Sequence, residues 1–122
     1  MKEVKVEIAK ALKASSTLVA LTNGAIYSGW PPLPIVPPPA VVGFYRVWGK
    51  RGVADGMMSQ RIEELYSIDI FAKTMIETEN AEIAIDAAMN TLPYIVMAEH
   101  GPDFFEQDTK IFHKVLRYVI KS

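Results

Sequence analysis

The stretch "RIEELYSIDIFAK", residues 61–73, carries the clearest structural signal in the chain. Its apolar and polar side chains alternate, the first set being Ile62, Tyr66, Ile68 and Ile70 and the second Glu63, Ser67 and Asp69. Successive side chains of a β-strand point to opposite faces of the sheet, so this alternation predicts a strand with one buried and one solvated face. Glu63 and Asp69 are then solvated surface carboxylates and not an acid–base pair.

The residues before this strand predict its antiparallel partner. The stretch "AVVGFYRVWGK", residues 40–50, is rich in β-branched and aromatic residues, and three glycines interrupt the chain in "GKRGVADGMMS", residues 49–59. We therefore expect two strands joined by a long hairpin loop.

This loop is the main candidate contact surface. Basic residues supply charge, methionines supply adaptable apolar area, and glycines allow the loop to order on binding. The candidates are Lys50, Arg51, Met57, Met58 and Arg61. An ordinary flexible turn is the alternative.

Six of the chain's eight prolines lie in "SGWPPLPIVPPPAVV", residues 28–42. Proline fixes φ and removes an amide donor, so we expect a stiff, extended connection between a short strand, "AIYSG", and the strand at 40–50. Trp30 and Leu33 are its candidate contact residues. Trp30 and Trp48 are each interpreted as a lid on the core, with an interface anchor as the alternative.

Two main helices are predicted from apolar residues that recur at helical spacing. The first is "KEVKVEIAKALKA", residues 2–14. The second is "ENAEIAIDAAMNTL", residues 79–92, which Thr78 precedes and Pro93 ends.

Shorter elements complete the pattern. Ser15 or Ser16 is expected to cap a short helical turn, "TLVAL", that Asn23-Gly24 ends. After the second main helix, "YIVMA" predicts a strand, "EHGPDFFEQD" a turn and "TKIFHKVLRYVI" a final strand.

Together these elements predict an α+β fold in the order α-β-β-β-α-β-β. Its sheet is mixed and mainly antiparallel, with four to five strands, and the two main helices pack on one face. A chain of 122 residues forms a single domain, residues 1–122.

Composition narrows the classes of function. Thirteen Lys and Arg against fourteen Asp and Glu give a net charge of −1 with no long block of one sign, so no direct sequence-specific nucleic-acid binding is expected. The one long uncharged run, residues 14–45, contains six prolines and several polar residues and is no continuous apolar helix, so no membrane partner is expected. The chain has no cysteine, and His100 and His113 match no metal-ligand spacing. With no recognised catalytic motif, we predict no catalytic residue, metal or cofactor, and no enzymatic activity.

The order of elements resembles the tail-completion, or tail-terminator, proteins of long-tailed bacteriophages and prophages. The resemblance covers nearly the whole chain and is carried by "LVALTNGAIYSGWPP", "PPPAVVGFYRVWG", the glycine-containing loop, "YSIDIFAK", the helix after a threonine and "VLRYVI". It implies a structural virion protein that forms a homo-oligomeric ring, a hexamer on the tail. Such a ring caps the tail tube, ends tail polymerisation and provides the head-joining surface.

The resemblance also implies partners and a location. The partners would be copies of the same chain, the tail-tube protein and a head-completion or connector protein. The protein would be in the host cytoplasm during assembly and then in the virion, at the head–tail junction.

The alternative function is a small soluble binding module that uses the proline stretch at 31–39 as a polyproline ligand. Both "PPLP" and "PIVP" meet the P-x-x-P pattern. Such ligands usually carry a basic flank, and the nearest arginine, Arg46, lies inside the predicted strand.

Overall fold

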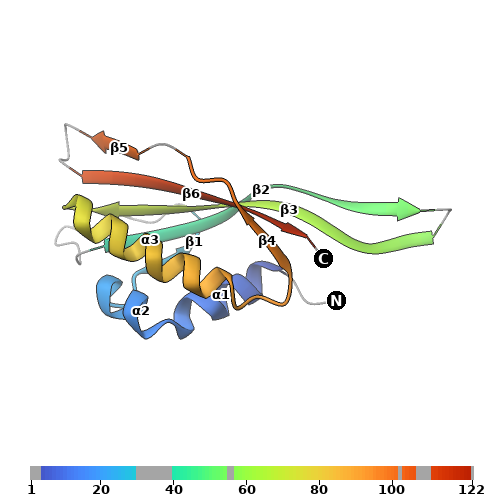
Figure 1. The fold of residues 1–122 in the computed structure, drawn as a ribbon, viewed down its shortest axis with the longest axis horizontal. Coiled ribbons are helices and arrows are strands. Elements are labelled where there is room, and N and C mark those ends of the chain that lie inside the picture. Colours follow the sequence, from blue (N-terminus) through green and yellow to red (C-terminus); the bar gives the residue numbers. More distant parts are fainter. Residues whose placement is uncertain (1–3, 30–39, 55–56, 102, 107–110, 122) are drawn as a thin grey trace.

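The fold consists of a mixed β-sheet with helices on one of its faces (Figure 1). The computed structural model describes residues 4–29, 40–54, 57–101, 103–106 and 111–121. The helices are α1 Val4–Ala14, α2 Ser16–Thr22 and α3 Met75–Met89, and the strands are β1 Ile26–Ser28, β2 Ala40–Ala54, β3 Met57–Ala72, β4 Ile95–Ala98, β5 Asp103–Glu106 and β6 Ile111–Lys121. The predicted α+β class, the mixed sheet and the placement of the helices are confirmed.

Within the described residues, the sheet has six strands in the order β1-β2-β3-β6-β4, with β5 also paired to β6. Only β1 and β2 run parallel, and the other pairs are antiparallel. The sixth strand, β5, falls in the stretch at 99–108 that was predicted as a turn. Phe104 and Phe105 favour a strand there, and β6 supplies a free edge for it to pair with.

The core lies between the helices and the sheet face that they cover. On β3, the predicted apolar positions Tyr66, Ile68 and Ile70 are all at most 2% exposed. Ile68 pairs with Phe44 of β2 on one side and with Leu116 of β6 on the other, so three buried side chains form a row across the sheet. The apolar half of the alternating pattern therefore faces the helices.

The helix ends follow local side-chain chemistry. The Oγ of Ser15 accepts a hydrogen bond from the Leu18 amide at 3.2 Å, which caps α2, and Asn23 ends that helix in the left-handed conformation with φ of 51°. These features were predicted. The expected start of α3 was wrong: Thr74 is its N-cap, and Thr78 lies buried in the first turns with its hydroxyl bonded to the Met75 carbonyl at 2.6 Å.

Loss of the α3 cap has a measurable cost. The Oγ1 of Thr74 accepts a hydrogen bond from the Glu77 amide at 3.2 Å. We expect Thr74→Ala to lower the free energy of unfolding by about 1 kcal/mol, since that amide then loses its partner. Thr17→Ala, at an exposed helical position, is the control and should stay within about 0.5 kcal/mol of the parent. Urea titrations followed by circular dichroism measure both, and equal effects would contradict the assignment of the cap.

Two of the three polar residues of the β3 pattern, Ser67 and Asp69, are buried, which corrects the prediction of a solvated face, while Glu63 is half-buried. Ser67 is 1% exposed and Asp69 is 2% exposed. The Ser67 hydroxyl donates to Asp69 Oδ1 at 2.9 Å, and His113 Nε2 of β6 lies 3.3 Å from Asp69 Oδ2. Phe71 stacks on the His113 ring at 4.3 Å between centroids. Alternation shows which side chains share a face, but it does not show whether that face is covered.

The buried carboxylate should matter for stability. Asp69→Asn keeps the shape and an acceptor for Ser67 but removes the charge opposite His113. We expect it to lower the free energy of unfolding by about 1–3 kcal/mol, because a buried polar partner is lost. Glu79→Gln, at an exposed position of α3, should change it by less than about 0.5 kcal/mol. Guanidinium titrations measure the free energy of unfolding of both variants. Small and equal changes for Asp69→Asn and Glu79→Gln would show that Asp69 is solvated.

Candidate functional site

The β2–β3 hairpin extends well past the helices (Figure 1). On β3, pairing with β6 stops at Glu63, which lies opposite Lys121 at the end of β6. Beyond that point, residues 50–54 of β2 and 57–62 of β3 pair with each other and with no further strand of the described chain. We call these two segments the arm.

The arm is a two-stranded ribbon that leaves the body of the protein. Such a ribbon is only marginally stable alone in water, and the outer edge of each of its strands pairs with no other described strand. A neighbouring chain that packs on the ribbon or pairs with an edge would stabilise it. The arm is therefore the best candidate for a contact surface.

The structure places the five predicted loop contacts on the arm backbone: Lys50, Arg51, Met57, Met58 and Arg61. The predicted long loop at 49–59 is wrong, because β2 continues to Ala54 and β3 already begins at Met57. The arm side chains lie outside the described part of the structure. Trp30, Leu33 and the proline stretch at 31–39 also lie outside the described residues, so those contacts stay predictions.

Two large apolar side chains, Val47 and Trp48, are exposed at the root of the arm, where it joins the body; the sequence marked only Trp48, as an alternative interface anchor. The register shifts between Arg46 and Trp48, so Val47 is an extra residue that forms a β-bulge. Val47 is 48% exposed and Trp48 is 40% exposed. The expectation that Trp48 forms a lid on the core is therefore wrong, and the bulge is the reason for its outward placement.

A buried carboxylate, that of Glu64, holds the two strands together where the arm joins the body. Glu64 is 7% exposed, and its Oε2 accepts a hydrogen bond from the Tyr66 hydroxyl at 3.1 Å and lies 3.3 Å from Arg46 Nη1. Gly49 lies directly opposite Glu64, and a Cβ at that position would be only 3.0 Å from Glu64 Cγ. Glycine is thus used here for close packing within a strand, which explains why it did not mark a loop.

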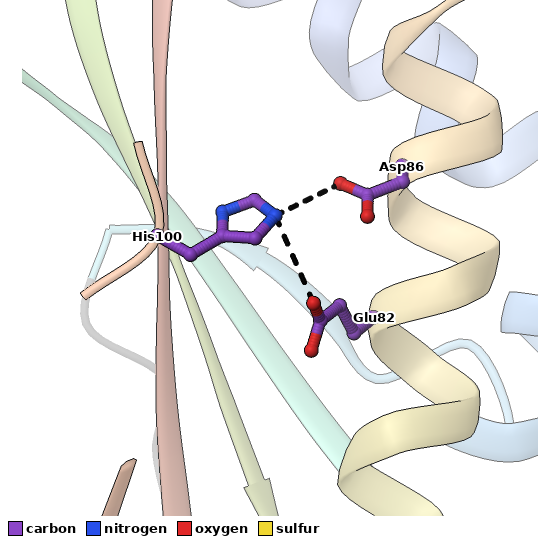
Figure 2. A group of neighbouring side chains, drawn as sticks. All are labelled: Glu82, Asp86 and His100. Atoms are coloured by element: carbon purple, nitrogen blue, oxygen red, sulfur yellow. Dashed lines mark ion pairs between the residues drawn. The ribbon is translucent and has the colours of Figure 1, made fainter. Parts of the chain in front are cut away.

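A second polar cluster lies between α3 and the β6 edge of the sheet. Figure 2 shows His100, from the segment between β4 and β5, with its imidazole pointing at Asp86 and Glu82 of α3. His100 Nε2 lies 3.2 Å from Asp86 Oδ1 and 3.8 Å from Glu82 Oε2. Two β6 side chains complete the cluster: Lys114 Nζ is 2.9 Å from Glu82 Oε1, and the Tyr118 hydroxyl donates to Asp86 Oδ1.

The β6 side chains keep one protonation state in this cluster. The hydrogen bond to Glu82 raises the pKa of Lys114, so its ammonium stays charged at neutral pH. Burial, followed by the hydrogen bond to Asp86, raises the pKa of Tyr118, so its phenol stays a donor. This cluster was not predicted from the sequence, where its one local signal is the four-residue spacing of Glu82 and Asp86.

Apolar side chains are exposed on the body as well. Ile76 and Ile83 of α3 are each 69% exposed, and Ile95 on the edge strand β4 is 61% exposed. A groove of about 550 Å³ also runs beside α3, lined by Leu21, Ile83 and several alanines. Scattered exposed apolar residues are common on protein surfaces, so they carry less weight than the arm. None of the helices described is both long and apolar enough to cross a membrane.

Comparison with known proteins gives a likeness of fold. No protein-family model matches the chain, and no curated protein matches it either. Among solved structures, one similar chain comes from a structure described as "Virion of native gene transfer agent (GTA) particle". The match has a TM-score of 0.56 and 17% sequence identity, and it covers 98% of this chain and 95% of that chain. At this identity, the comparison establishes that the two chains share a fold along nearly their whole length.

Proposed function

We propose that this protein is a structural virion component that caps the tail tube as a ring, ends tail polymerisation and provides the surface to which the head joins. The observation that carries the proposal is the fold match over 98% of the chain to a chain of a virion particle. The resemblance of the element order to tail-completion proteins supports the same role. In this role the protein acts by assembly and catalyses no reaction.

The ring would contain six copies in a closed head-to-tail arrangement. Each copy in such a ring presents two different surfaces to its two neighbours. The arm supplies one of them, because it reaches beyond the body of its own subunit (Figure 1). The exposed Val47 and Trp48 at the root add apolar area where a neighbour or the tube would pack.

The proposed partners follow from the position of the ring. One face would contact the tail-tube protein, and the other a head-completion or connector protein. Assembly would take place in the host cytoplasm, and the protein would then remain at the head–tail junction of the virion.

Electron microscopy of tail tubes tests this function. The purified chain is mixed with tubes assembled from the tail-tube protein of the same phage or prophage. We expect a ring of density at one end of each tube and an arrest of tube growth. A chain that stays monomeric with these tubes and leaves their ends bare would overturn the proposal. Because a ring of this kind can form on the tube alone, the oligomeric state is measured with tubes present.

A further inference from the structure

The cluster of Glu82, Asp86 and His100 has the composition and geometry of a cation site. Glu82 and Asp86 lie one helical turn apart on α3, so their carboxylates share a face of the helix. His100 faces both of them from the other side (Figure 2). One donor atom from each of the three residues lies within 4.8 Å of the other two. A Zn²⁺ ion bonds nitrogen and oxygen ligands at about 2.0–2.2 Å, so two of its ligands are separated by roughly 3–4 Å. The contacts of His100 Nε2 at 3.2 and 3.8 Å fall in that range.

The backbone on both sides of His100 is fixed, so the imidazole is already positioned. The Glu99 amide donates to the Arg117 carbonyl at 2.7 Å, and the Gly101 amide donates to the Val115 carbonyl at 2.9 Å. The imidazole also packs edge-on against the ring of Tyr118, with 5.3 Å between centroids. A ligand held in this way loses little entropy when a metal binds.

Further contacts hold both carboxylates. Lys114 engages Oε1 of Glu82, while the oxygen nearest His100 is Oε2. The Tyr118 hydroxyl, in contrast, donates to Oδ1 of Asp86, which is also the oxygen nearest His100. Such outer contacts typically orient metal ligands. The three side chains retain between 23% and 40% exposure, so water can reach the site and complete the coordination.

His100 Nε2 faces both carboxylates and carries at most one hydrogen, whereas one cation can bond to an atom of all three side chains. We propose that Glu82, Asp86 and His100 bind one Zn²⁺ ion that ties α3 to the segment between β4 and β5. Imidazole with carboxylates favours Zn²⁺ over Mg²⁺, which prefers oxygen ligands and retains its water. This inference is independent of the proposed role in the virion.

Calorimetric titration of the full, untagged chain with Zn²⁺ tests the site. We expect one equivalent to bind, and Mg²⁺ to bind at least about 100-fold more weakly. His100→Ala, Glu82→Gln and Asp86→Asn should each weaken Zn²⁺ binding by about tenfold or more, since each removes a ligand. Glu99→Gln, which neutralises the carboxylate next to His100 in the sequence, is the matched control and should bind like the parent. Circular dichroism verifies that each variant is folded.

Substitution of Lys114 is expected to strengthen Zn²⁺ binding, the opposite of the ligand substitutions. Its ammonium lies 2.9 Å from Glu82 and repels a bound cation. We expect Lys114→Met to strengthen Zn²⁺ binding about threefold or more, because a nearby positive charge is removed. Absence of Zn²⁺ uptake by the parent chain, or uptake that none of the three ligand variants weakens, would overturn the proposal. The parent titration remains decisive even if a variant does not fold.

Discussion

Truncation of Ile68 to alanine is expected to lower the free energy of unfolding by about 3–4 kcal/mol. Ile68 is 0% exposed and lies in the centre of β3, between Phe44 of β2 and Leu116 of β6. These two neighbours belong to different strands under the helices, so they cannot both collapse into the space that the side chain leaves. The loss therefore includes both the transfer of apolar surface and the remaining cavity.

The matched control for this variant is Ile83→Ala. It removes the same atoms from a helix position that is 69% exposed. The control should change the free energy of unfolding by less than about 0.5 kcal/mol, since little apolar surface is buried there and alanine is the better helix former. Guanidinium denaturation measures the free energy of unfolding of both variants, and we expect their m-values to equal that of the parent. Similar losses at Ile68 and Ile83 would show that the predicted core face of β3 is misplaced.

Much of the fold could be predicted from the sequence, because the alternation of apolar and polar residues and the residues that cap helices are local signals. Alternation over residues 61–73 identified β3 and the side chains that share its faces. Ser15 and Asn23 identified the ends of α2, because capping needs only residues within one turn. Coverage of a face is a non-local property, and for this reason Asp69 was expected in solvent although it is 2% exposed.

The length of the hairpin was mispredicted for a different reason. Glycine is a loop signal because it lacks a Cβ, but the same property permits close packing inside a strand. At Gly49 the packing of Glu64 uses it. The sequence stretch thus placed the candidate contact residues in the arm, while the form of the arm, a ribbon of two paired strands, depended on register pairs that no local pattern reveals.

The cluster around α3 could not be predicted from spacing alone. Its residues are far apart in the sequence: Glu82 is on α3, His100 lies between β4 and β5, and Lys114 is on β6. They meet only because β6 lies between β3 and β4 in the sheet. His100 and His113, which the sequence places on either side of one turn, are directed to opposite faces of the sheet. One faces Asp86 of α3 and the other faces Asp69 of β3.

Removal of the arm is expected to abolish tail capping while the fold remains intact. Gly49 and Glu64 are register partners at its root, so residues 50–63 can be replaced by Asn-Gly, the preferred two-residue hairpin turn. The buried residues of the described core lie outside the replaced segment, and we expect the free energy of unfolding to stay within about 1 kcal/mol of the parent. Binding to tail tubes should fall at least about tenfold, because a contact surface is removed whole.

A charge-reversal pair refines this test. Lys50→Glu with Arg51→Glu reverses two charges on the arm, and Lys10→Glu with Lys13→Glu reverses two exposed charges on α1. The first pair should weaken capping and the second should not, since charge reversal at a contact surface places like charges against the partner, and like charges repel. An armless chain that is folded and still caps tubes would exclude the arm as the contact and shift the interface to the exposed apolar residues of α3 and β4. Loss of capping in both charge variants would instead indicate a general electrostatic effect. A local contact through the arm predicts loss in the arm variant alone.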